Sequence, residues 1–256
     1  MAVKYIPGLV KENVNVTPGS PLKELLKLLL WIGGSLVVLY ILLGFVVNLM
    51  APRISPKVET AMGSLFKNHL CVHEIKKESG KLQKIMDVFK PFMTKEDRRL
   101  DYKVCVTRDN QVNAIAVPGG TVVVFSGLLD KVDSRDEIAF VLAHELGHFH
   151  HRDHLKGMGR ALVALVLSVT ILGENSPATN FIFNSLVQVE MKFSRNQEKA
   201  ADLFAVNLLK KCYGNADGAL AFMKKLASEE KRRKLFYYFS SHPHPSDRLE
   251  YIKEAL

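Results

Sequence analysis

Two histidines four residues apart, with a glutamate directly after the first, are the clearest chemical signal in the sequence. The stretch reads His144-Glu145-Leu146-Gly147-His148. On an α-helix, residues four apart lie on one face, one turn along, so both imidazoles can reach one metal ion. The glutamate projects from the neighbouring face, where it can take a proton from a metal-activated water. The spacing therefore predicts a hydrolytic zinc site with His144 and His148 as ligands and Glu145 as general base.

The residues before this motif predict a buried helix. Residues 138–143 are all apolar, so the helix is expected to run through a core, where unpartnered histidines and a glutamate would be costly. Asp133, Ser134 and Asp136 supply a cap and first-turn acids, so we expect the helix to begin near residue 135 and to run to about residue 155. A bound metal would resolve the cost of burying the motif.

A metal held by two histidines needs a third protein ligand, and two residues are candidates. His154 follows His148 at the metzincin spacing, but that scaffold needs a glycine where this chain has His151. Glu198 is followed four residues later by Asp202 on the same helix face, which suits a gluzincin site. Glu198 would complete a His2Glu set for one zinc ion per chain, and Asp202 would accept the N–H of a ligand imidazole.

Three sequence blocks together resemble the membrane-associated gluzincin peptidases. This family includes the CAAX prenyl endopeptidases, HtpX-type heat-shock proteases and OMA-type quality-control proteases. The blocks occur in the family's order at residues 113–129, at the His144 motif and at residues 194–202, and the resemblance spans residues 101–256. It implies that His144, His148 and Glu198 bind zinc and that Glu145 is the base. It also implies that substrate lies along an edge strand near Asn113, Ala114, Ile115 and Ala116.

A weaker fourth block of this resemblance is His242-Pro243, with Arg248 six residues after the histidine. The family pattern implies that His242 faces the cleft, where it can donate a hydrogen bond to the oxyanion, and that Arg248 buttresses the site. Pro243 and Pro245 keep the segment out of a helix, so a loop can deliver the side chain. Two alternatives stay open: His242 only caps the final helix, or His244, in the same His-Pro context, takes this role.

The rest of the pattern predicts a mostly helical α+β fold, a zincin-like metallopeptidase domain with a small antiparallel sheet behind one transmembrane helix. The expected strands are residues 102–107, 111–117 and 121–125, which are β-prone and separated by turn signals. The expected further helices are two within residues 57–92, broken near Ser79-Gly80, one from the Glu198 region to about Cys212 and one over residues 217–228.

Residues 28–52 form a run of 25 uncharged residues. As a helix this run is about 37 Å long, enough to cross a hydrocarbon core of about 30 Å. We therefore expect a polar segment over residues 1–27, a transmembrane helix over 28–52 and the zinc metallopeptidase domain over 53–256. Four lysines precede the span and two basic residues follow closely, which predicts a cytoplasmic N-terminus and a catalytic domain across the membrane. In a bacterium, we expect an inner-membrane protein with a periplasmic catalytic domain.

A second apolar stretch, residues 161–173, is too short to span a membrane. We expect it to pack in the domain, to rest on the bilayer, or to form a re-entrant hairpin with residues 181–189. His150, His151 and His154 are expected at the solvated end of the motif helix. The three cysteines form no Cys-x-x-Cys pair, so at most one disulfide and no cysteine metal site is expected.

The net charge of +9 suits anionic lipid headgroups, and no nucleic-acid motif accompanies it. The leading function is a membrane-anchored zinc endopeptidase acting on protein substrates in envelope or membrane protein quality control. The alternative is a chaperone or binding module with a structural zinc, but a purely structural site needs no base such as Glu145. A prenyl-peptide processor would need a multi-helix membrane chamber, which one span does not supply.

Overall fold

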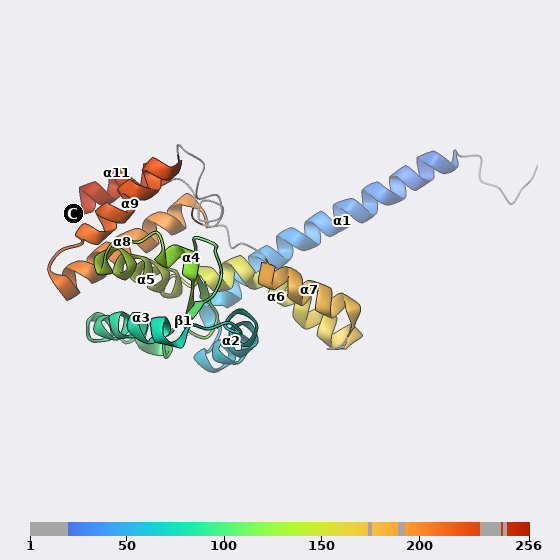
Figure 1. Ribbon diagram of the computed structural model, residues 1–256. Helices are drawn as coiled ribbons and strands as arrows, with labels where there is room; N and C mark the ends of the chain where they lie inside the picture. Colours follow the sequence, from blue (N-terminus) through green and yellow to red (C-terminus); the bar gives the residue numbers. More distant parts are fainter. Residues whose placement is uncertain (1–19, 174–175, 189–192, 231–241, 243–244) are drawn as a thin grey trace, which may run out of the picture. The chain divides into compact units, whose positions relative to one another are not determined.

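The structure is a computed structural model of the 256-residue chain and describes residues 20–173, 176–188, 193–230, 242 and 245–256 (Figure 1). Its helices and strands, in chain order, are α1 (Pro21–Met50), α2 (Pro56–Leu70), α3 (Lys76–Phe89), β1 (Lys103–Thr107), β2 (Ala114–Val117), β3 (Thr121–Phe125), α4 (Ser126–Leu129), α5 (Arg135–His150), α6 (Asp153–Leu172), α7 (Pro177–Gln188), α8 (Arg195–Tyr213), α9 (Asp217–Glu230) and α11 (Pro245–Ala255). Three short 3-10 turns, η1 (Ala51–Arg53), η2 (Lys90–Phe92) and η3 (Asp97–Arg99), lie between them. The chain divides into two compact units, residues 1–43 and residues 44–256. The predicted α+β, mostly helical fold is confirmed.

The sheet has the strand order β1-β3-β2 and is mixed. β2 and β3 form an antiparallel hairpin through the predicted turn, in which Gly119 and Gly120 adopt φ values of 84° and 87°. The expectation of an antiparallel sheet is wrong for β1, which runs parallel to β3. The reason is a contact with the start of α4: the chain leaving β1 is held beyond the end of β3, where the Asp109 amide donates to Ser126 Oγ at 3.0 Å and the Gly127 amide donates to the Asp109 carbonyl at 2.8 Å. β2 therefore returns on the far side of β3 and forms an edge of the sheet.

The central helix of the domain is α5, whose residues 137–149 are all buried. Ser134 caps it, as expected, with its hydroxyl accepting the Glu137 amide. α5 packs closely against α8, because Gly147 faces the backbone of Ala201; a Cβ at Gly147 would lie 2.7 Å from the Ala201 Cα. A glycine inside the motif thus permits the helix approach that brings α8 to the two histidines.

The prediction that the motif helix continues to about residue 155 is wrong. α5 ends at His150, Arg152 adopts a left-handed φ of 56°, and α6 starts anew at Asp153. The turn needs no glycine because Arg152 Nη1 donates to the backbone carbonyls of Ala51 and Ile54, at 2.8 Å each. His154 was expected in solvent but is fully buried, with its Nε2 2.8 Å from Glu59 Oε1.

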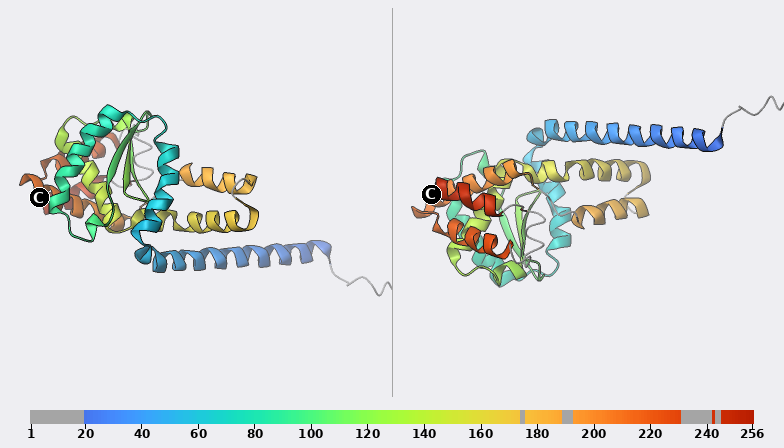
Figure 2. Two further views of the ribbon diagram at one scale, coloured as in Figure 1. Left: turned by 90° about the horizontal axis from the view of Figure 1, so that it is seen from below. Right: turned by 90° about the horizontal axis from the view of Figure 1, so that it is seen from above.

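The helices before the sheet differ from the prediction at one point. The break between α2 and α3 lies at residues 71–75, whereas Ser79 and Gly80 lie inside α3. Ser79 is tolerated there because its buried hydroxyl accepts the Val106 amide of β1 at 2.9 Å. Both helices pack against the sheet (Figure 2), and a Cys71–Cys105 disulfide joins the end of α2 to β1. This single disulfide fits the limit set by the three cysteines.

The second half of the domain follows the predicted pattern. α8 ends at Tyr213, with Gly214 in the left-handed conformation at a φ of 79°, and α9 follows directly. α6 and α7 lie side by side as a helical hairpin in both views of Figure 2. Near the connection between them, Ile171, Leu172 and Phe181 expose 74%, 55% and 72% of their surfaces. The predicted apolar stretch of residues 161–173 thus forms part of a helical hairpin. Large apolar side chains of this hairpin are exposed to solvent.

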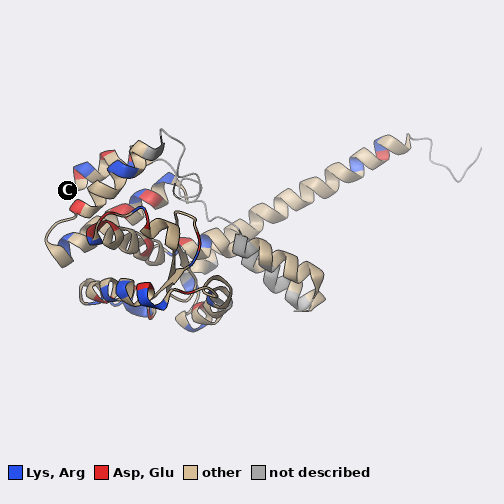
Figure 3. Ribbon diagram, viewed as in Figure 1, with Lys and Arg blue, Asp and Glu red and all other residues tan. Residues whose placement is uncertain are grey.

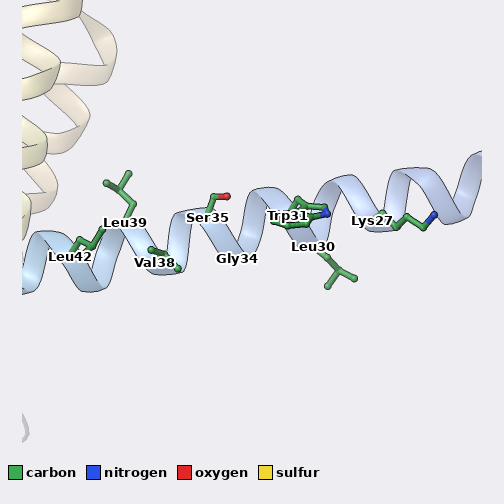
Figure 4. Close-up of a pocket in the computed structure, with 8 residues that line it drawn as sticks. All are labelled: Lys27, Leu30, Trp31, Gly34, Ser35, Val38, Leu39 and Leu42. Carbon is green, nitrogen blue, oxygen red and sulfur yellow. The ribbon is translucent and has the colours of Figure 1, made fainter.

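α1 is, among the described residues, the helix long and apolar enough to cross a membrane, over Pro21–Val47. It starts before the predicted residue 28, because Pro21 suits a first helical turn and Glu24 lies near its positive N-terminal end. Beyond its first turns it carries no charge (Figure 3). Figure 4 shows a hollow along its side, lined by Lys27, Leu30, Trp31, Gly34, Ser35, Val38, Leu39 and Leu42. All eight belong to this one helix, so the hollow is a surface feature and not a ligand cavity.

Candidate metal centre

Two helices bring the three predicted ligands together. α5 presents His144 and His148 one turn apart, with their Nε2 atoms 3.1 Å from each other. Ser194 caps the start of α8 and forms a capping box with Gln197, so Glu198 lies in the first turn of the helix. The Glu198 carboxylate oxygens lie 3.6 Å from His144 Nε2 and 3.5 Å from His148 Nε2, and all three side chains are at most 1% exposed. The His2Glu arrangement expected from the sequence is thus present.

His242 joins the same cluster. Its Nδ1 lies 3.0 Å from Glu198 Oε1 and 3.3 Å from His144 Nε2, and one ligand atom from each of the four residues lies within 4.8 Å of every other. A tetrahedral zinc site with bonds of about 2.1 Å separates neighbouring donors by about 3.4 Å. The spacing and the chemistry of these imidazoles and this carboxylate therefore fit a zinc ion.

Each histidine of the motif has its own outer carboxylate. His144 Nδ1 lies 2.8 Å from Asp202 Oδ1, and His148 Nδ1 lies 3.2 Å from Asp153 Oδ2. An imidazole that donates its Nδ1 proton to a carboxylate keeps the lone pair of Nε2 for the centre. The two carboxylates thus favour the tautomer in which both Nε2 lone pairs face the cluster.

Arg248, on α11, contacts the carboxylates of both Asp202 and Glu198 on α8. Its Nε and Nη2 donate to the two oxygens of Asp202 at 2.8 Å each, and its Nη1 lies 2.6 Å from Glu198 Oε2. Tyr251, also on α11, donates its hydroxyl to Asp202 Oδ2 at 2.7 Å. Burial alone would raise the pKa of Asp202, but the Arg248 charge and the His144 imidazole lower it to about 2. At Glu198, burial is likewise outweighed by Arg248, His242 and His148 together, and its pKa lies well below the usual value. Both carboxylates are therefore ionised at neutral pH.

Glu145 lies on the side of the cluster that faces the sheet. Its Oε1 is 3.7 Å from His242 Nε2, and the Ala116 amide of β2 donates to its carboxylate. Burial raises the pKa of Glu145. Its Oε2 is buried and has no hydrogen-bond partner among the described residues. The carboxylate is thus close to the ligands and still able to accept a proton.

The residues expected to hold substrate lie at or beside β2. Asn113 precedes the strand, where its Oδ1 accepts the Ala114 amide at 2.9 Å. Asn113, Ala114 and Ala116 are buried and Ile115 is half-buried. Because β2 is an edge of the sheet, the expectation of an edge strand is confirmed. The binding of substrate along it stays a prediction.

The position of His154 excludes it as the third ligand of the metzincin alternative. Its Nε2 contacts Glu59, and it is not among the four clustered residues. His244, the competitor of His242, lies outside the described residues. The sequence reading missed Asp153 and Tyr251. A turn after His150 would have pointed to Asp153, but neither glycine nor proline marks that turn.

Comparison with known proteins gives a consistent family assignment. The family model described as peptidase family M48 matches residues 76–256. The chain is 33% identical over 163 residues to the metalloprotease YcaL of Escherichia coli, covering 61% of this chain and 62% of that protein. It is 30% identical over 161 residues to the mitochondrial metalloendopeptidase OMA1 of Schizosaccharomyces pombe, covering 61% and 47%. A putative beta-barrel assembly-enhancing protease of Vibrio cholerae is 29% identical over 170 residues, covering 62% and 35%.

The chain thus spans less than two thirds of the length of each of these relatives. The family model, in contrast, covers the chain from α3 to the last helix and includes every residue of the clustered site. The histidine motif, the glutamate of α8 and the residues of α11 all lie inside the matched region. The chain therefore belongs to peptidase family M48.

Proposed function

We propose that this chain is a zinc metalloendopeptidase that hydrolyses internal peptide bonds of protein substrates. The observation that carries the proposal is the buried His144, His148 and Glu198 cluster with Glu145 beside it and an edge strand against that carboxylate. Zinc is favoured because the donors are imidazoles and one carboxylate at tetrahedral spacing. When bound, the ion would lower the pKa of a water and polarise the scissile carbonyl.

Glu145 performs the proton transfers in this proposal. It accepts a proton from the attacking water, whose oxygen bonds to the carbonyl carbon of the substrate. When the C–N bond breaks, Glu145 delivers that proton to the leaving amine. The raised pKa caused by burial suits the first step, because a carboxylate of low pKa would accept a proton from water poorly. Asp202, Asp153 and Arg248 hold the ligands without touching substrate.

For His242 we propose the oxyanion role. Its Nε2 faces Glu145, so it lies on the side where the carbonyl oxygen of a substrate would develop charge. Its Nδ1, however, lies within the ligand cluster, which also fits a fourth protein ligand. Four protein ligands make a closed site of the structural kind. This observation favours the second candidate function, a non-proteolytic chaperone or binding module with a structural zinc.

Substrates are proposed to bind as extended segments along β2. An edge strand offers backbone hydrogen bonds to a peptide and reads few side chains, which suits a protease for unfolded proteins. A role in envelope or membrane protein quality control is supported by relatives such as the putative beta-barrel assembly-enhancing protease of Vibrio cholerae.

We further propose that α1 anchors the protein in a bacterial inner membrane, in contact with lipid, with the catalytic domain on the periplasmic side. The span of Pro21–Val47 supports the anchor. The Cys71–Cys105 disulfide supports an oxidising compartment, because cytosolic thiols are kept reduced. Four lysines precede residue 28, two of them in the first turns of α1, against Arg53 and Lys57 after the helix, and this difference supports the same orientation.

The test is cleavage of an unstructured protein such as casein by the purified full-length chain in detergent micelles. We expect mass spectrometry to find internal cleavage sites, a zinc chelator to abolish cleavage, and added Zn²⁺ to restore it. Cleavage that is unaffected by chelation would refute zinc catalysis. A zinc-loaded protein that holds casein without cutting it would favour the chaperone.

A further inference from the structure

The segment that follows α1 is fastened to the start of α6, close to the metal centre. Val47 packs on Gly159, where an added Cβ would lie 2.1 Å from Val47 Cγ1. The Ala51 and Ile54 carbonyls both accept from Arg152 Nη1 at 2.8 Å. The region where α1 ends and the turn where α5 passes into α6 are therefore in direct contact.

A second contact joins the two regions through buried side chains. Glu59 in the first turn of α2 and His154 in the first turn of α6 are both 0% exposed, and their closest atoms are 2.8 Å apart. His154 Nδ1 also lies 3.4 Å from the backbone carbonyl of the metal ligand His148. A buried polar pair is costly to separate, so it fixes where α2 and α6 meet. The mechanism derived above uses neither side chain.

Asp153 lies in the sequence between Arg152 and His154, the two residues that contact the segment after α1. Arg152 precedes it and His154 follows it, and its own carboxylate faces His148 Nδ1 at 3.2 Å and accepts from Gln197 at 2.9 Å. Arg152 has a left-handed φ of 56°, a conformation that residues other than glycine rarely adopt without support. The two carbonyls that it binds supply that support. The position of Asp153, and so the orientation of the His148 ring, depends on contacts made by the segment after α1.

We propose that Glu59 and Arg152 are positioning residues, which set Asp153 against His148 and thereby tune metal affinity and turnover. This inference rests on the proposed zinc function. We call the contacts of Arg152 with Ala51 and Ile54 and of Glu59 with His154 the juxtamembrane latch. Through the latch, the segment that leaves the proposed membrane anchor helps to shape the metal site.

The test uses full-length protein in detergent micelles with two variants that release the latch in different ways. Glu59→Ala removes the partner of His154. Arg152→Gly removes both hydrogen bonds to the carbonyls, but glycine adopts the left-handed turn without strain. For each we would measure the zinc Kd by competition with a chromophoric chelator, kcat and KM at saturating zinc, and Tm.

We expect both variants to weaken zinc binding about tenfold and to lower kcat several-fold at saturating zinc with KM nearly unchanged, as for loss of an outer-shell contact. Glu59→Gln, whose amide oxygen can still accept from His154, should recover most of both losses. Ser79→Ala is the matched control, because it removes a buried hydrogen bond between α3 and β1. It should lower Tm alone.

Two other outcomes have separate meanings. If Glu59→Ala and Arg152→Gly lower Tm as Ser79→Ala does but leave the zinc Kd and kcat at wild-type values, the latch is only structural and the inference is overturned. If the wild-type chain itself binds no zinc, the proposed function is refuted, and the inference that rests on it is overturned as well. Arg152→Gly keeps the test decisive even where Glu59→Ala does not fold, because it leaves the buried Glu59–His154 pair intact.

Discussion

Replacing Asp202 by alanine is expected to weaken zinc binding and to destabilise the domain by separable amounts. Asp202 is fully buried, accepts hydrogen bonds from two nitrogens of Arg248 and from the Tyr251 hydroxyl, and lies 2.8 Å from His144 Nδ1. Without it, His144 loses the acceptor that fixes its tautomer. Removal of such an outer carboxylate costs roughly ten- to a hundredfold in metal affinity.

The loss of stability follows from the pKa of Asp202. A shift from 3.8 to about 2 corresponds to about 2 kcal/mol in favour of the ionised, folded form. Because the folded pKa is the lower one, this contribution is complete above pH 3.8 and is lost as the pH falls towards 2. The difference in unfolding free energy between wild type and Asp202→Ala should therefore stay constant from pH 8 to pH 5. A domain of this size should lose about 4–8 °C in Tm.

The assay is a zinc titration against a chromophoric chelator, paired with urea unfolding of the metal-free protein at several pH values. Asp217→Ala, which changes an exposed acid in the first turn of α9, is the control and should alter neither quantity. An unchanged zinc Kd in Asp202→Ala would refute the role of this carboxylate at His144. A variant that is unfolded even at saturating zinc would make Asp202 chiefly structural.

The other predictions concern the ligands, the oxyanion and the anchor. Metal analysis should find one zinc per chain in the wild type and large losses in His144→Ala and Glu198→Ala. Undiminished zinc in Glu198→Ala would indicate that His242, and not Glu198, is the third ligand. His242→Ala should lower kcat about a hundredfold with zinc content and Tm nearly unchanged, whereas a rise in kcat would identify His242 as a ligand that blocks the site. A fragment of residues 57–256 should fold and remain soluble without detergent, as assayed by phase separation. Complete partition into detergent would instead place the α6–α7 hairpin in the bilayer.

The parts of the site that the sequence predicted well depend on spacing within one helix. His144 and His148 share a face of α5, and Glu198 and Asp202 share a face of α8, so helical geometry alone relates each pair. Gly147, which allows α5 and α8 to pack closely because it has no side chain, lies inside the motif itself. These relations need no knowledge of distant segments.

The parts that were wrong or missed depend on contacts between distant segments. α5 ends where it does because Arg152 binds backbone carbonyls about a hundred residues earlier in the chain. No glycine or proline marks this end in the sequence. Asp153 was missed, and His154 was expected in solvent, for this reason. The parallel pairing of β1 likewise follows from Ser126 holding the chain at Asp109. Local propensity cannot report such interactions.

The central claim is that Glu145 acts as the base at a hydrolytic zinc site. The most direct measurement compares casein cleavage by the wild type and Glu145→Gln at equal, verified zinc content. The amide is nearly isosteric but cannot take a proton from water at neutral pH, so the variant should keep its zinc and its Tm and lose cleavage by orders of magnitude. Cleavage by Glu145→Gln within tenfold of the wild-type rate would contradict the account.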